Sequence, residues 1–142
     1  MSWRRVFAGR VDQIPAARHF AMYLFAETAI ADEVGFVVTE LASNAVRHTL
    51  SGQGGSFSVE LVNNGLAYVA VSDLGGGGYP TVRPDPIDGS NREHGRGLLA
   101  ISKLAVSLGV HGSPEEGHTV WADLAGVCNR PAQPPVEVAP AI

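Results

Sequence analysis

The chain has 142 residues, which is the size of one domain that can bury its own core without disulfide bonds. Its formal net charge of -4 argues against general binding to nucleic acid, because binding through charge needs a basic surface. With one cysteine, Cys128, and no apolar run near the roughly 18 residues of a membrane span, we expect a cytoplasmic protein that contacts no membrane.

The first half of the chain predicts a strand and two helices. Residues 4–10 have the pattern of a short edge strand, and Pro15 suits the first turn of a helix that continues over 16–29. Asp32 is positioned to cap a second helix, which ends near the glycines of SGQGG at 51–55.

The second half predicts a hairpin, a third helix and two further strands. Apolar and polar residues alternate on both sides of Asn64 and Gly65, a pair typical of hairpin turns. Residues 95–110 predict a helix followed by a strand, and residues 117–126 predict a last strand. Together the elements predict an α+β two-layer sandwich, with helices on one face of a mixed, mostly antiparallel sheet.

Two stretches lack the pattern of regular structure. Residues from about 75 to 95 are rich in glycine, proline and charge, and so long a segment inside a compact domain is either a functional lid or a sign of a wrongly assigned element. Residues 127–142 are rich in proline and poor in apolar side chains, which predicts a disordered tail. The predicted domain therefore covers residues 1–126.

Polar residues recur on one side of the second predicted helix, in VTELASNAVRHT. Glu40, Asn44 and His48 are each four residues apart, so they project from nearly the same side. An asparagine can give Mg2+ a neutral oxygen ligand, and a glutamate one turn away can orient or deprotonate a nucleophile. The alternative is a solvated helix face whose spacing is accidental.

A second motif, SDLGGGG, places Asp73 at the end of an alternating strand, before Gly75 and Gly77. A carboxylate fixed at a strand end can accept a hydrogen bond from the exocyclic amine of a base, and the glycines let a flat ring approach the backbone. The same pattern also fits an ordinary glycine-rich turn capped by aspartate.

In a third motif, Gly95 and Gly97 flank Arg96 at the start of the third predicted helix. Free backbone N–H groups at a helix start attract anions, and an arginine adds a charge for phosphate oxygens. A hinge that ends the preceding loop is the alternative.

The order of these motifs resembles the GHKL, or Bergerat-fold, ATP-binding superfamily. The segments ELASNAVRHT, VSDLGGGG, HGRGLLAISKLA and GHTVWADL are most similar to the RsbW-like anti-sigma-factor serine/threonine kinases, especially the single-domain versions of actinobacteria. The resemblance covers roughly residues 4–125.

This resemblance implies a site for ATP and Mg2+. Glu40 would activate the attacking hydroxyl, Asn44 would bind magnesium, and Asp73 would recognise the adenine. The other ATP-binding positions that it implies are Gly75, Gly77, Gly95, Arg96, Gly97, Leu98 and Thr119. The roles of Arg47, His48 and His118 stay open.

The resemblance also implies a function. The protein would be a homodimeric kinase that phosphorylates an anti-anti-sigma (STAS-domain) partner and, when that partner is phosphorylated, sequesters a sigma factor. The alternative is a nucleotide-dependent binding module with little or no phosphotransfer. The presence of Glu40 favours the kinase, because a module that only binds nucleotide needs no base.

Overall fold

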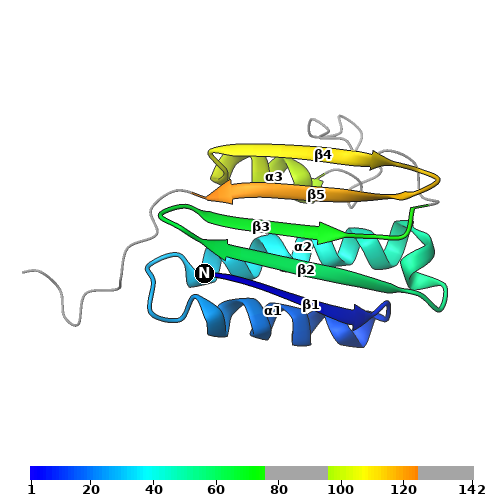
Figure 1. Ribbon diagram of the computed structural model, residues 1–142, viewed down its shortest axis with the longest axis horizontal. Coiled ribbons are helices and arrows are strands. Elements are labelled where there is room, and N and C mark those ends of the chain that lie inside the picture. Colours follow the sequence, from blue (N-terminus) through cyan, green and yellow to red (C-terminus); the bar gives the residue numbers. More distant parts are fainter. Residues whose placement is uncertain (76–95, 125–142) are drawn as a thin grey trace, which may run out of the picture.

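The computed structural model describes residues 1–75 and 96–124, and within them one sheet is covered by helices on a single face (Figure 1). The strands are β1 (Ser2–Ala8), β2 (Ser56–Asn63), β3 (Ala67–Ser72), β4 (Ser107–Ser113) and β5 (Gly117–Leu124). The helices are α1 (Ile14–Leu24), α2 (Ala31–His48) and α3 (Arg96–Leu104), with the 3-10 turns η1 (Val11–Gln13) and η2 (Leu50–Gly52).

The strand order across the sheet is β1-β2-β3-β5-β4. The predicted α+β two-layer sandwich is confirmed, although every strand pairing in the described residues is antiparallel, so the sheet there is not mixed. β5 is inserted between β3 and β4, which brings residues near 118 next to the end of β3. No helix among the described residues is long and apolar enough to cross a membrane.

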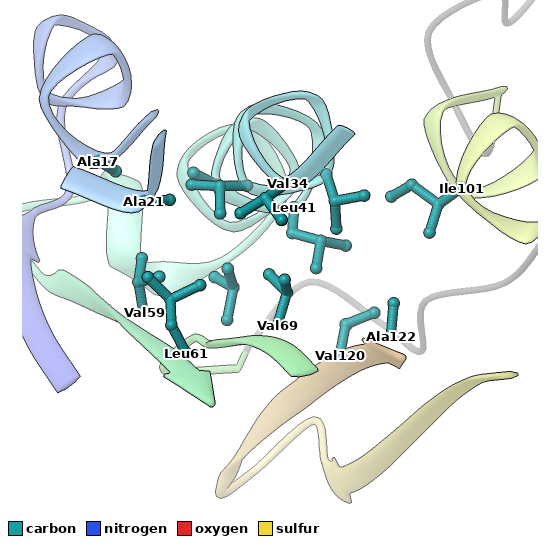
Figure 2. Close-up of a cluster of buried hydrophobic side chains, with 14 of the residues drawn as sticks. Ala17, Ala21, Val34, Leu41, Val59, Leu61, Val69, Ile101, Val120 and Ala122 are labelled. Atoms are coloured by element: carbon teal, nitrogen blue, oxygen red, sulfur yellow. The ribbon is translucent and has the colours of Figure 1, made fainter. Parts of the chain in front are cut away.

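The core lies between the sheet and the three helices, and α2 is at its centre (Figure 2). Small residues of α1, Ala17 and Ala21, are fully buried and let that helix approach α2 closely. On the other side, Ile101 of α3 extends toward α2. The sheet contributes Val59, Leu61, Val69, Val120 and Ala122, which all project toward the helices.

The structure differs from the prediction at the connection between α1 and α2. α1 ends at Leu24, five residues earlier than expected, and α2 begins at Ala31. Asp32 is therefore not the cap: it lies in the first helical turn, where a negative charge is favoured by the helix dipole. Thr28 shapes the connection, because its hydroxyl donates to the Phe25 carbonyl at 2.7 Å and accepts from the Ile30 N–H at 3.3 Å.

Candidate functional site

The Asp73 carboxylate follows β3 directly and is held by backbone groups from two segments. Its Oδ1 accepts hydrogen bonds from the N–H of Gly75 at 2.7 Å and from the N–H of His118 at 3.1 Å. The side chain is only 6% exposed. Both bonds reach Oδ1, and Oδ2 accepts none of the hydrogen bonds found between described residues, so it keeps the capacity to accept from a further donor.

Gly75 needs to be glycine for two reasons. Its φ of +83° is unfavourable for a residue with a side chain, and a Cβ there would lie 2.3 Å from the carbonyl oxygen of Pro114. Its own carbonyl accepts from the Leu50 N–H at 2.7 Å, and the buried Ser51 hydroxyl accepts from the Leu74 N–H at 3.0 Å. The turn after β3 is thus fixed both to the β4–β5 hairpin and to the segment after α2.

His118 lies beside Asp73, which the sequence analysis did not predict. Its side chain is buried, and its Nδ1 lies 4.0 Å from Oδ1 of Asp73. Val120, Ala122 and Leu124 are the buried residues of an alternating pattern in β5, and the same period of two places His118 on that face, toward the helices. This alternation was the signal that could have located it.

Thr119 lies one residue further and points to the opposite face of the sheet. Its hydroxyl is 2.8 Å from the hydroxyl of Ser72 on the neighbouring strand. The structure therefore brings the ring of His118, rather than the hydroxyl of Thr119, to the Asp73 carboxylate. The role of Thr119 in an adenine pocket stays a prediction.

Glu40 of α2 meets the first turn of α3. A Cβ built on Gly97 would lie 2.3 Å from Oε1 of Glu40, so this glycine packs directly on the carboxylate. Burial raises the pKa of Glu40 above its usual 4.5, and the nearby charge of Arg47 opposes this by lowering the pKa. Two residues from separate predicted motifs are thus in contact.

Of the remaining predicted site residues, some lie within the described parts of the chain and others do not. Asn44 lies half-buried on α2, one turn after Glu40. Leu98 is 3% exposed and packs in the core. Arg96 begins α3, while Gly77 and Gly95, most of the predicted lid and the predicted tail lie outside the described residues.

The antiparallel sheet has helices on one face, one carboxylate fixed at a strand end and a second against a helix start. This arrangement fits an ATP-binding domain. The chain belongs to the family described as histidine kinase-like ATPase domain, whose model matches residues 7–124. The match confirms the GHKL superfamily and supports ATP binding by this domain. No curated protein matches the sequence.

Proposed function

We propose that this domain is a serine/threonine protein kinase of the RsbW-like anti-sigma-factor type, which acts as a homodimer. Its substrate is an anti-anti-sigma (STAS-domain) protein, and the phosphorylated partner leaves a sigma factor bound to the kinase. The observation that supports a kinase most directly is the Glu40 carboxylate, which lies against the first turn of α3 and has a raised pKa. A protein that only binds nucleotide needs no such group.

Recognition of adenine by Asp73 is supported by the way its carboxylate is fixed. The two backbone hydrogen bonds orient Oδ1, so Oδ2 can accept from the exocyclic amino group of adenine. Guanine has a carbonyl oxygen at the equivalent ring position, which would place an acceptor against an acceptor. ATP is therefore preferred over GTP.

Asn44 is the proposed magnesium ligand, through its neutral amide oxygen. The described residues contain no group of three or more His, Cys, Asp or Glu side chains that could hold a metal ion. That fits an ion that takes most of its ligands from phosphate oxygens and water. Magnesium bound with ATP neutralises phosphate charge and polarises the transferred phosphoryl group.

Glu40 acts as the general base in the proposed reaction. The hydroxyl oxygen of the partner's serine or threonine bonds to the γ-phosphorus, the bond from that phosphorus to the β,γ-bridging oxygen breaks, and the hydroxyl proton moves to the Glu40 carboxylate. ADP is the leaving group. Because burial raises the pKa of Glu40, this carboxylate accepts a proton more readily than an exposed one.

The experiment is phosphate transfer from ATP labelled at the γ-position to a STAS-domain protein, with ATP affinity measured in parallel by calorimetry. Glu40→Gln is the matched variant, because it keeps the shape of the side chain and removes the base. We expect the wild type to label the partner on serine or threonine. If the wild type binds ATP and partner but transfers no phosphate, the kinase proposal is wrong and the binding-module alternative stands.

A further inference from the structure

Gly97 occupies a position in α3 where its backbone does not require glycine. Its φ lies outside the positive range that side chains rarely adopt, and glycine is a poor helix former. What distinguishes the position is space: apart from the neighbouring backbone of α3, the three atoms of described residues nearest to a Cβ built there all belong to Glu40, with Oε1 at 2.3 Å, Cδ at 3.3 Å and Cβ at 3.4 Å. A side chain at 97 would occupy the place of the Glu40 carboxylate.

We infer that Gly97 is a positioning residue for Glu40, an inference that rests on the proposed kinase function. The missing side chain leaves room for the carboxylate to lie directly on the first turn of α3. The position of the helix then fixes the position of the base. This role is distinct from phosphate binding, which was the role expected for Gly97.

Helix α3 and the Glu40 side chain differ in how easily they can move. α3 is anchored in the core by Leu98 and Ile101, which are 3% and 0% exposed. The atom nearest to the added Cβ is the far end of a flexible glutamate side chain. A methyl group at 97 should therefore displace the Glu40 carboxylate and leave α3 in place.

The direct test is a crystal structure of the nucleotide-free Gly97→Ala variant, which requires no kinase activity. Non-bonded carbon and oxygen atoms pack at roughly 3.4 Å or more, so the carboxylate should move by about 1 Å or more from its present place. The melting temperature should stay the same or rise, because alanine is the better helix former. An unmoved Glu40 beside a shifted α3 would overturn the inference.

The kinetic test is a double-mutant cycle with Glu40→Asp, whose side chain is one methylene shorter and withdraws the carboxylate toward the present place of Cδ, 3.3 Å from the added Cβ, so that the methyl group no longer overlaps it. In the Glu40 background, Gly97→Ala should lower kcat for phosphotransfer at least about tenfold with little change in the KM for ATP. In the Glu40→Asp background, the same substitution should change kcat by less than about twofold. An equal loss in both backgrounds, or a loss mainly in ATP affinity, would assign Gly97 to phosphate binding instead.

These tests separate two failures. If the wild type transfers no phosphate, the proposed function is wrong, while the crystal structure still decides whether Gly97 sets the position of Glu40. If the wild type is active and the cycle is additive, the proposed function stands and the positioning role is wrong.

Discussion

Asp73→Asn tests the proposed recognition of adenine with a small change in shape. The asparagine carbonyl can keep the hydrogen bonds from the N–H groups of Gly75 and His118, so the turn after β3 should survive. The amide nitrogen then replaces Oδ2 and presents a donor to the amino group of adenine. A buried donor left facing a donor costs about 2 to 3 kcal/mol, which corresponds to a roughly 30- to 150-fold rise in the Kd for ATP.

The assay is isothermal titration with Mg-ATP, and Asp123→Asn is the matched control. Asp123 is a carboxylate on β5 that faces away from the helices and accepts a hydrogen bond from the Ser107 hydroxyl at 3.0 Å. The same substitution there should leave the Kd within about twofold. The reasoning is refuted if both variants bind ATP as tightly as the wild type while their circular dichroism spectra are unchanged.

The remaining predictions concern the chemistry and the turn after β3. Glu40→Gln should reduce phosphotransfer by roughly 100-fold in the kinase assay and leave ATP affinity nearly unchanged. Burial raises the pKa of Glu40 above 4.5, so the contribution of the protonated group to the free energy of unfolding is fully present below that pH and is lost as the pH rises through the raised pKa. Urea titrations should therefore find Glu40→Gln more stable than the wild type near pH 7, and this difference should vanish toward pH 4. Asn44→Ala should weaken binding of ATP with Mg2+ but not binding of ATP in EDTA, measured by calorimetry. Gly75→Ala should lower the free energy of unfolding by about 1 to 3 kcal/mol in urea titrations. Gly54→Ala should cost less, because Gly54 has a similar φ of +88° but nothing within 4 Å of the added Cβ.

The elements could be predicted where local pattern decides them. The alternation on both sides of Asn64 and Gly65 correctly predicts the β2–β3 hairpin, since turn chemistry and strand period are local properties. The end of α1 could not be predicted this way. Phe25 is fully buried and lies edge-on to Trp3 of β1, so packing with a distant strand takes the chain out of the helix.

The motifs of the candidate site could be identified in the sequence, but the contacts between them could not. Residue type and spacing made Glu40 and Asp73 candidates, whereas the contact of Glu40 with Gly97 depends on how α3 packs beside α2. Likewise, His118 reaches Asp73 only because β5 pairs with β3, and that strand order is not encoded in any single motif. Both contacts depend on strand order and helix packing, which the spacing of the motifs does not reveal.

Glu40 and Gly97 are each an unfavourable choice for the stability of this fold. A carboxylate whose pKa is raised by burial destabilises the folded state near neutral pH, and glycine inside a helix is worse than alanine. The structure places these two residues in contact, with the glycine leaving room for the carboxylate oxygen. Residues that cost stability are expected to cluster where activity needs them. The contact therefore favours a protein that uses this carboxylate in a reaction over one that only binds nucleotide.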